Sequence, residues 1–301
     1  MKIVYFGNNV RGTVCLKHLL ANHMRVVGAV GHPVSTALWG ETVEEICRQE
    51  NIPFYQPENV NSNQFVKILE QIDFDIAVLS GYGKIIRQPL LNLAPLGFIN
   101  LHGGELPHYR GSSTSRWVLI NDEKVAGISI LYVDKGIDTG PVLDQKQFII
   151  KECFDIKDII LNQLALFPPL LLSVIDKISK SEITPTIQNV NQGTYWHALQ
   201  ADDGQINWQT MTSRQIFNLT RAFTTPYSGA FSFVNGKKIN ILKSKEIQET
   251  FKGLSGRVCA VRDNGVVVIA KDRGLLIECV KGDSNEVVNA REVLKIGNYL
   301  K

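Results

Sequence analysis

Apolar residues in the first 150 positions gather in short runs, separated by stretches of helical periodicity. The runs predict four buried strands, and they lie at residues 2–6, 25–30, 75–79 and 97–101. Between them, apolar residues at helical spacing predict helices at 10–20, 42–50 and 63–71. Strands that alternate with helices predict an α/β fold with a mainly parallel, doubly wound sheet and helices on both of its faces.

The pattern changes after residue 150. A helix is predicted at 155–179, followed by an irregular polar stretch up to 203 and a short helix at 212–223. The remaining residues alternate apolar and polar positions in short runs that glycines interrupt, which is typical of antiparallel strands and of small barrels. We therefore expect two domains, an α/β domain at 1–204 and a smaller β-rich, barrel-like C-terminal domain at 205–301.

The composition excludes intrinsic disorder and coiled coil, because 44% of the 301 residues are apolar and only 20% are charged. A formal charge of +3 also excludes a chain built to coat nucleic acid or an anionic membrane. The charge is divided unevenly, however. Residues 1–204 hold 17 basic and 21 acidic side chains, a net −4, whereas residues 205–301 hold 15 and 8, a net +7. Any strong basic feature must therefore be local, and the C-terminal domain as a whole is basic.

The most apolar stretch, residues 159–174, lacks the continuity of a membrane span. Asn162, Gln163 and the pair Pro168-Pro169 interrupt it, and a bilayer requires about 20 mostly apolar residues. The N-terminus enters a strand-like segment directly, without the apolar core and cleavage site of a secretory signal. We expect a cytoplasmic protein.

The five cysteines are odd in number, and none is paired at C-x-x-C spacing. This favours small buried hydrophobes over a disulfide framework or a zinc site.

A strand, a glycine and a helix at the N-terminus invite a dinucleotide-binding interpretation, but the residues do not support it. The segment FGNNVRG supplies only Gly7 and Gly12, and the second strand ends in Gly31-His32-Pro33, where an acidic ribose-binding residue would be expected. The free N–H groups of the helix could still meet an anion, with Asn9 and Arg11 beside it. A simple polar turn is the equal alternative.

The densest group of chemically active side chains lies in residues 97–144. Asn100 and His102 are two apart on a predicted strand, so their side chains leave one face near its C-terminal end, where open α/β sheets bind ligands. Asp138 follows a further predicted strand, in the loop DKGIDTG. The imidazole could take a proton from an attacking amine, the carboxylate could orient the imidazole, and the amide could stabilise an oxyanion. Two other interpretations stay open: a loop cap with an Asx turn, or a metal site that adds His108.

The segments NLHGGELPHYRG and DKGIDTG resemble the two motifs of the 10-formyltetrahydrofolate-dependent formyltransferases. The resemblance covers most of the chain, since DDGQINW is similar to the start of the C-terminal domain in longer members of that family. It implies a Rossmann-like catalytic domain, a β-rich C-terminal domain, and formyl transfer to a primary amine without a metal. Asn100, His102 and Asp138 would be the catalytic residues.

The same resemblance implies where the folate would bind. The pterin would lie between the loop at 82–86 and the loop at 133–138, mostly on backbone groups. The cofactor-binding residues would be Tyr82, Gly83, Ile85, Ile86, Val133 and Asp134. Ordinary core packing is the alternative for Ile85 and Ile86.

Two acceptors compete for the formyl group. The +7 C-terminal domain favours initiator methionyl-tRNA. Family members that act on tRNA carry a basic insertion after the second strand, whereas the stretch GHPVSTALWGETVEEI has no Lys or Arg and three glutamates. The motif also continues as RGSSTSRW, whose hydroxyls, arginine and aromatic suit a sugar, a diphosphate and a base.

We therefore expect a nucleotide-linked amino sugar of surface polysaccharide synthesis as the acceptor, with methionyl-tRNA as the alternative. The basic domain would then serve for packing or for contact within a homodimer. Arg110 could instead hold its loop in shape, and Trp117 could start a core helix. A folate- or nucleotide-binding module without turnover and a purine-pathway formyltransferase are the weaker alternatives. The expected substrate-binding residues are Asn9, Arg11, Arg110, Ser112, Ser113 and Trp117.

Overall fold

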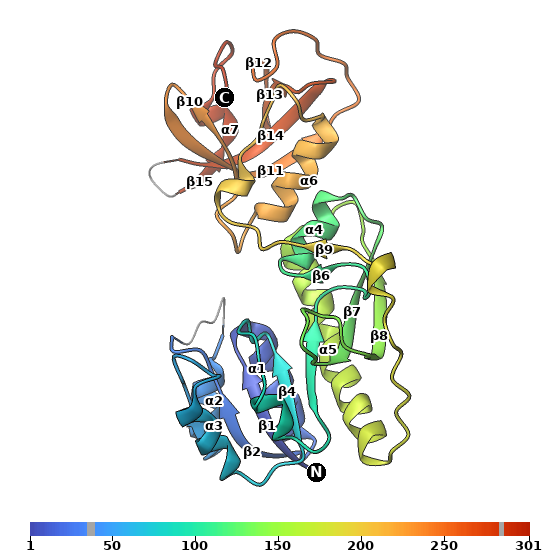
Figure 1. Ribbon diagram of the computed structural model, residues 1–301. Helices are drawn as coiled ribbons and strands as arrows, with labels where there is room; N and C mark the ends of the chain where they lie inside the picture. The colour runs from blue at the N-terminus through green and yellow to red at the C-terminus, as the bar shows by residue number, and fades with distance from the viewer. Residues whose placement is uncertain (35–39, 283–285) are drawn as a thin grey trace. The chain divides into compact units, whose positions relative to one another are not determined.

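The computed structural model describes residues 1–34, 40–282 and 286–301, and the chain forms two compact units (Figure 1). Unit 1 comprises residues 1–114, 126–148 and 161–196. Unit 2 comprises residues 197–301 together with two segments from earlier in the chain, 115–125 and 149–160. Nothing in the apolar pattern pointed to these two additional segments, and the boundary at 204 and 205 stays a prediction.

Unit 1 is built on a mixed seven-stranded sheet with the order β3-β2-β1-β4-β5-β7-β8. Strands β1 to β5 pair in parallel, as the alternating pattern predicts, but β7 runs antiparallel to β5. Two-residue strands β6 and β9 form a separate parallel pair. The sheet strands are β1 (Lys2–Gly7), β2 (Arg25–Val30), β3 (Phe54–Tyr55), β4 (Ile76–Ser80), β5 (Phe98–His102), β7 (Val125–Tyr132) and β8 (Val142–Ile149), and the separate pair is β6 (Arg110–Gly111) with β9 (Tyr195–Trp196).

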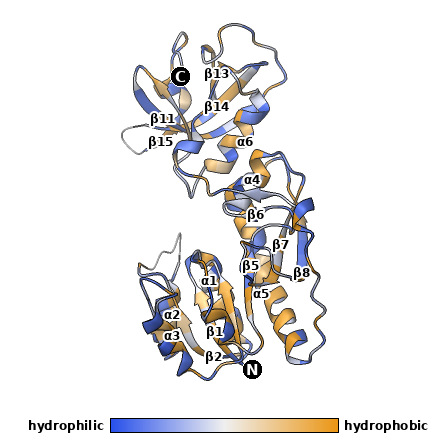
Figure 2. Ribbon diagram, viewed as in Figure 1, coloured by the Kyte–Doolittle hydropathy of each residue, from blue (hydrophilic) through white to orange (hydrophobic). Residues whose placement is uncertain are grey.

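Helices cover both faces of this sheet, which confirms the expected fold class. The period of two along β1 sends Ile3 and Tyr5 into one apolar cluster and Val4 and Phe6 into another. The first cluster includes side chains of α1 (Asn9–Ala21), α2 (Val43–Gln49) and α5 (Ile156–Ser179), and the second includes those of α3 (Asn63–Glu70) and the short helix η1 (Leu90–Asn92). The apolar strands of unit 1 stand out in Figure 2.

Helix α5 has the length and apolar composition of a membrane span, and it is the one such helix in the described part of the chain. Its apolar side chains have another use, because Phe167, Leu171 and Val174 are fully buried in the sheet's apolar cluster. Two prolines, Pro168 and Pro169, also lie within it. These contacts are those of a core helix, whereas the expectation that polar residues and prolines leave this stretch short of a span is not borne out by its length and composition.

The main body of unit 2 is an antiparallel sheet with the order β10-β11-β14-β13-β12, with β15 paired to β14. The C-terminus closes it: Leu300 bridges Val234 of β10, and Tyr299 bridges Arg257 just before β12. A closed antiparallel sheet is a barrel, as the glycine-interrupted alternation predicts. The elements are α4 (Thr114–Ile120), η2 (Val190–Gln192), η3 (Asp202–Gly204), α6 (Ser213–Phe223), β10 (Ala230–Val234), β11 (Lys237–Glu246), β12 (Val258–Arg262), β13 (Gly265–Ile269), β14 (Gly274–Lys281), β15 (Val287–Asn289) and α7 (Ala290–Val293), of which η2 lies in unit 1.

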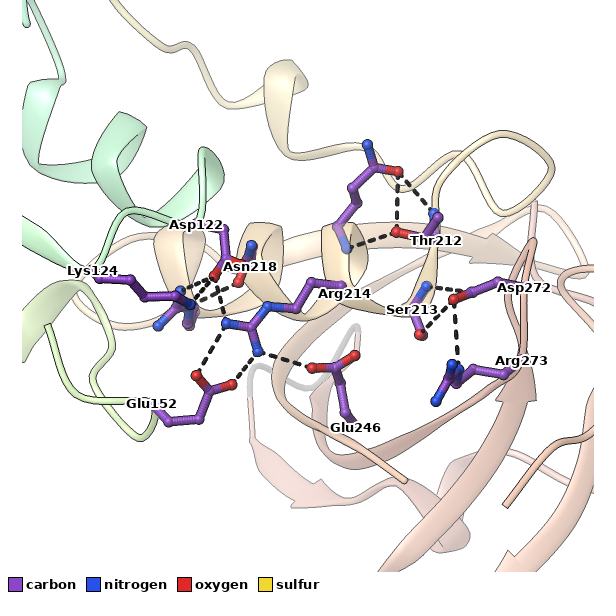
Figure 3. Close-up of polar contacts among 12 residues, drawn as sticks. Asp122, Lys124, Glu152, Thr212, Ser213, Arg214, Asn218, Glu246, Asp272 and Arg273 are labelled. Carbon is purple, nitrogen blue, oxygen red and sulfur yellow. Dashed lines mark hydrogen bonds and ion pairs between the residues drawn. The ribbon is translucent and has the colours of Figure 1, made fainter. Parts of the chain in front are cut away.

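Arg214 of α6 contacts both additional segments of unit 2 (Figure 3). Arg214 pairs with Asp122 of the first segment, with Glu152 of the second, and with Glu246 at the end of β11, where Nη1 lies 2.9 Å from Oε2. Arg221 adds a contact of 3.4 Å to Asp122. We call these five residues the Arg214 cluster. The hydrogen bond from Arg214 holds the pKa of Asp122 at about 2.

All five cysteines are free thiols. Cys15 and Cys47 are buried, and burial raises the pKa of Cys15 to about 11 and that of Cys47 to about 12. Cys259 and Cys279 are only partly buried, so the prediction of buried cysteines, which rests on the four that lie in apolar runs, holds in full for Cys15 and Cys47. Cys153, which lies outside those runs, is exposed.

Candidate functional site

Strand β5 presents Asn100 and His102 on one side, as the period of two requires. The intervening Leu101 and the preceding Ile99 point into the apolar cluster and are almost fully buried. His102 is only 6% exposed, and it lies at the C-terminal end of a strand in the parallel part of the sheet. The imidazole therefore sits where open α/β sheets present ligand-binding groups.

Asp138 completes a buried cluster with these two residues. Its Oδ1 accepts a hydrogen bond from Asn100 Nδ2 at 3.2 Å, and its Oδ2 accepts one from the backbone N–H of Gly111 at 2.9 Å. The same Oδ2 lies 3.4 Å from His102 Nδ1. Asp138 adopts a left-handed backbone conformation with a φ of 53°, which aspartate tolerates better than most residues. The predicted amide, imidazole and carboxylate are thus brought together.

The other nitrogen of the imidazole, Nε2, lies 2.6 Å from the backbone carbonyl of Tyr109. Both ring nitrogens therefore face an oxygen in this conformation. The chain can approach the ring so closely because residue 104 is glycine: a Cβ there would lie 2.8 Å from Nε2 and 2.4 Å from the Tyr109 oxygen. For His102 to accept a proton at Nε2, the Tyr109 carbonyl must first move away.

A segment that links α5 to unit 2, residues 186–196, lies along both loops of this cluster. Thr194 accepts the N–H of Arg110 with its carbonyl and the N–H of Tyr109 with its hydroxyl. The ring of Trp196 stacks on that of Tyr109, with centroids 5.7 Å apart. We call residues 186–196 the linker segment. It fixes the loop that carries the Tyr109 carbonyl.

The loop predicted to hold the folate is anchored by its neighbours. Gly83 donates its N–H to His32 Nε2 at 3.3 Å, and the Tyr82 ring packs edge-on against His32. Burial, with a smaller contribution from Lys84, lowers the pKa of His32, which keeps this nitrogen an acceptor. Ile86 is 3% exposed and belongs to the core, whereas Ile85 is 53% exposed. The alternative of core packing thus describes Ile86 but not Ile85.

The second predicted folate loop follows β7. Val133 donates its N–H to the carbonyl of Phe98, and its side chain packs against the second apolar cluster. Asp134 accepts hydrogen bonds from the N–H of Gly136 at 3.0 Å and from the Thr139 hydroxyl at 2.7 Å. Both residues therefore shape the turn that leads to Asp138.

Among the residues predicted to bind the acceptor, Asn9 and Arg11 make contacts inside unit 1. Asn9 donates to the carbonyl of Gly81 and accepts from the N–H of Arg11. The Arg11 guanidinium donates to the carbonyl of Leu101 at 3.1 Å and lies over the ring of Phe167. It therefore supports the end of β5, next to His102.

Residues 110–117, which follow the first motif, belong partly to unit 1 (up to 114) and partly to unit 2 (from 115). Arg110 donates to the carbonyl of Val190, so it holds its loop in shape, and Ser112 is exposed. Ser113 has a left-handed backbone with a φ of 56°. Trp117 belongs to unit 2, in α4, and its indole N–H donates to the carbonyl of His197. The neighbouring Arg116 is 8% exposed and lies against the rings of Phe223 and Tyr227.

The weaker hypothesis of a metal site finds no set of ligands in the described part of the chain. No group of three His, Cys, Asp or Glu side chains lies close enough there to hold a metal ion. His108 is exposed and does not join His102 and Asp138.

Comparison with known proteins agrees with the two-part organisation. The formyl transferase family model matches residues 18–165, and the model of the formyl transferase C-terminal domain matches residues 198–297. The methionyl-tRNA formyltransferase of Thermodesulfovibrio yellowstonii is 30% identical over 298 residues, which cover 97% of this chain and 94% of that protein. The bifunctional polymyxin resistance protein ArnA of Wigglesworthia glossinidia brevipalpis is 30% identical over 98% of this chain and 45% of its own length.

A solved structure shares the fold. The N-formyltransferase from Helicobacter canadensis, in complex with folinic acid and dTDP-3-aminofucose, has a TM-score of 0.69 and 21% identity over 92% of this chain and 99% of that one. The mixed sheet, the C-terminal barrel and the matched families define a two-domain transferase. The chain belongs to the formyltransferase family.

Proposed function

We propose that this enzyme transfers a formyl group from 10-formyltetrahydrofolate to a primary amine, with Asn100, His102 and Asp138 as the catalytic residues. The observation that carries the proposal is the convergence of these three side chains, through contacts of 3.2 and 3.4 Å, at the end of β5. The amine nitrogen attacks the formyl carbon, and His102 accepts the proton that this nitrogen loses. The bond between the formyl carbon and N10 of the folate then breaks, N10 takes up a proton, and tetrahydrofolate leaves. Asp138 orients the imidazole and stabilises its cationic form.

Asn100 is suited to the oxyanion role. A carboxamide nitrogen carries two N–H groups, and one of them is directed to Asp138 Oδ1. The second can donate to the oxygen that becomes negative when the amine adds to the formyl carbon. Asp138 therefore fixes the orientation of both the base and the oxyanion donor.

The folate would bind between the loop at 82–86 and the loop at 133–138. The exposed Ile85 side chain offers an apolar surface to a pterin, while Asp134 and His32 keep the two loops in shape. The Helicobacter canadensis N-formyltransferase binds folinic acid, and this supports the folate donor. The proposed reaction uses no metal ion.

For the acceptor we propose a nucleotide-linked amino sugar of surface polysaccharide synthesis. Residues 31–46 contain no Lys or Arg and three glutamates, and residues 1–204 carry a net charge of −4. A transfer RNA that approaches this part of the chain would meet an acidic segment instead of the cations that neutralise phosphates. Part of that segment, residues 35–39, lies outside the described residues.

The residues that would face such an acceptor are those of the loop at 110–113, with Asn9. The Ser112 hydroxyl is exposed and can bond a sugar, whereas Arg11 and Arg110 act on the shape of the site through the carbonyls of Leu101 and Val190. Trp117, by contrast, donates its N–H to the carbonyl of His197 and packs against the His197 ring within unit 2.

Initiator methionyl-tRNA is the second candidate acceptor. It is favoured by the net charge of +7 on residues 205–301 and by relatives that match along their whole length, such as the methionyl-tRNA formyltransferase of Thermodesulfovibrio yellowstonii.

An acceptor assay decides between them. The purified enzyme is given 10-formyltetrahydrofolate with either a panel of nucleotide-linked amino sugars or charged initiator tRNA, and formylation is followed by mass spectrometry. We expect turnover of a sugar and none of the tRNA. Robust tRNA formylation without sugar turnover would refute the first acceptor, and loss of neither activity in His102→Ala would refute the proposed catalytic site.

A further inference from the structure

One side chain of the linker segment grips the loop that carries Asp138. Gln188 Nε2 donates to the backbone carbonyl of Asp138 at 3.0 Å and to that of Gly140 at 2.6 Å. A carboxamide nitrogen has two N–H groups, so a single side chain can donate to both of these carbonyls. Because both partners are acceptors, they also fix which end of the carboxamide is nitrogen.

The turn that Gln188 grips needs external support. Asp138 has a φ of 53°, and a non-glycine residue in that region is held by its surroundings. Asp134 supports the turn from inside through hydrogen bonds from the Gly136 N–H and the Thr139 hydroxyl, neither of which involves residue 138. Gln188 is therefore the side chain that contacts the backbone of Asp138 itself.

The opposite end of the same carboxamide indicates that Gln188 is present for its two donors and not for apolar packing. Gln188 Oε1 is buried, and it has no hydrogen-bond partner among the described residues. Burying an acceptor without a partner costs free energy, which an apolar residue of similar length would avoid. A residue kept for packing would not need this oxygen, whereas two donors aimed at one turn need the carboxamide.

We propose that Gln188 is a positioning residue for catalysis, which acts by holding Asp138 in the geometry that orients His102 and Asn100. This inference rests on the proposed catalytic role of Asp138. A displaced turn would shift the carboxylate relative to His102 Nδ1 and Asn100 Nδ2, and displacements on the order of 1 Å can lower rates about 100-fold. The carboxylate would still be present, so folate and acceptor binding would be retained.

The test compares the steady-state kinetics of four proteins, with each substrate varied in turn: wild type, Gln188→Met, Asp138→Asn and the double variant. Methionine keeps the length of the side chain and removes both donors. For Gln188→Met we expect kcat to fall roughly 10- to 100-fold, with the KM values for both substrates within about 2-fold of wild type. In the Asp138→Asn background the same change should cost less than about 2-fold, because Gln188 acts only through the carboxylate.

Ile187→Ala is the matched control, since Ile187 is the neighbouring residue of the linker segment and is 85% exposed. Its kcat should equal that of wild type. Equal effects of Gln188→Met in the wild-type and Asp138→Asn backgrounds, or an unchanged kcat, would overturn the inference. If Asp138→Asn itself retains full activity, the proposed catalytic site fails first, and the two failures are thereby distinguished.

Discussion

The cluster at the end of β5 and the Arg214 cluster both join residues that are far apart in the sequence, but they use charge in opposite ways. In unit 2, one guanidinium pairs with Asp122, Glu152 and Glu246, so its donors are committed to carboxylates. In unit 1, the Asp138 carboxylate has no Lys or Arg partner within the described ranges of the chain, and is held by Gly111 N–H, Asn100 and His102.

In the proposed mechanism, this difference separates the Asp138 carboxylate, which can assist a proton transfer, from the carboxylates that are paired with Arg214. The charge of a carboxylate paired with an arginine is already balanced by a permanent cation, so it stabilises a second, newly formed cation only weakly. A carboxylate held by an amide and a backbone N–H keeps its orientation while its charge remains available to an imidazole that becomes cationic during proton transfer. In the proposed mechanism, polar clusters of similar size therefore serve stability in unit 2 and catalysis in unit 1.

The largest expected effect comes from removing that available charge or its partner. His102→Ala and Asp138→Asn should each lower kcat by on the order of 100-fold or more, as is typical for positioned acid–base groups. Both variants should remain folded, with a free energy of unfolding close to that of wild type. Steady-state kinetics with the preferred acceptor and folate titrations check this; a kcat near that of wild type in either variant would contradict it.

Asn100→Ala tests the proposed oxyanion role of the third residue in this cluster. If the second N–H of Asn100 stabilises the oxyanion, kcat should fall by about 10²- to 10³-fold, which is typical of one oxyanion-hole donor. The folate affinity should remain, because the pterin is expected to bind the two loops. Near-wild-type turnover would remove Asn100 from this role and leave it as a support for Asp138.

The opposite result is expected in unit 2. Arg214→Met removes the cation that three carboxylates share, and its side chain is only 25% exposed, so we expect a loss of about 1–2 kcal/mol in local stability. Amide hydrogen exchange should quicken in peptides of α6 and of residues 115–125 and 149–160, but not in β5. Lys180→Met is the control, because Lys180 belongs to an exposed i, i+4 pair with Asp176. Equal exchange in wild type and Arg214→Met would contradict a stabilising role.

Much of this organisation could be predicted from the sequence. The features that were missed all depend on tertiary contacts, which leave no local pattern. Apolar periodicity revealed the strands and helices because burial alone sets it, and the motif spacing brought Asn100, His102 and Asp138 together. The antiparallel direction of β7 was not accessible, since its apolar run reads the same in either direction. Arg116 looked suited to a diphosphate, but only tertiary packing shows that it lies between aromatic rings. Gln188 had no local signal, because it lies in an irregular polar stretch.

Acid should weaken unit 2 through the same carboxylates. The Arg214 hydrogen bond holds the pKa of Asp122 at about 2, below its reference of about 3.9. A depressed pKa contributes stability that is fully present above the unfolded value and is lost as the pH falls toward the folded one. The protection of α6 amides against hydrogen exchange, relative to the intrinsic exchange rate at each pH, should therefore fall between about pH 4 and pH 2. The Arg214→Met variant should lose less over that interval, and an identical pH response in both proteins would exclude Arg214 as the cause.

Added salt should change stability least of all the conditions considered. It tests whether the ion pairs of the Arg214 cluster are screened like exposed pairs or protected like partly buried ones. The Debye length falls from about 10 Å at 0.1 M to about 3 Å at 1 M salt, so exposed pairs are screened and partly buried ones less so. Asp122 is 36% exposed and Arg214 is 25% exposed, which places the cluster between these limits. We therefore expect 1 M NaCl to remove less than about half of the stability difference between wild type and Arg214→Met, as measured by exchange in α6 at pH 7. If 1 M NaCl removed the whole stability difference between wild type and Arg214→Met, the ion pairs of Arg214 would behave as exposed surface pairs. The two clusters would then differ only in the proposed catalytic role of the cluster at the end of β5.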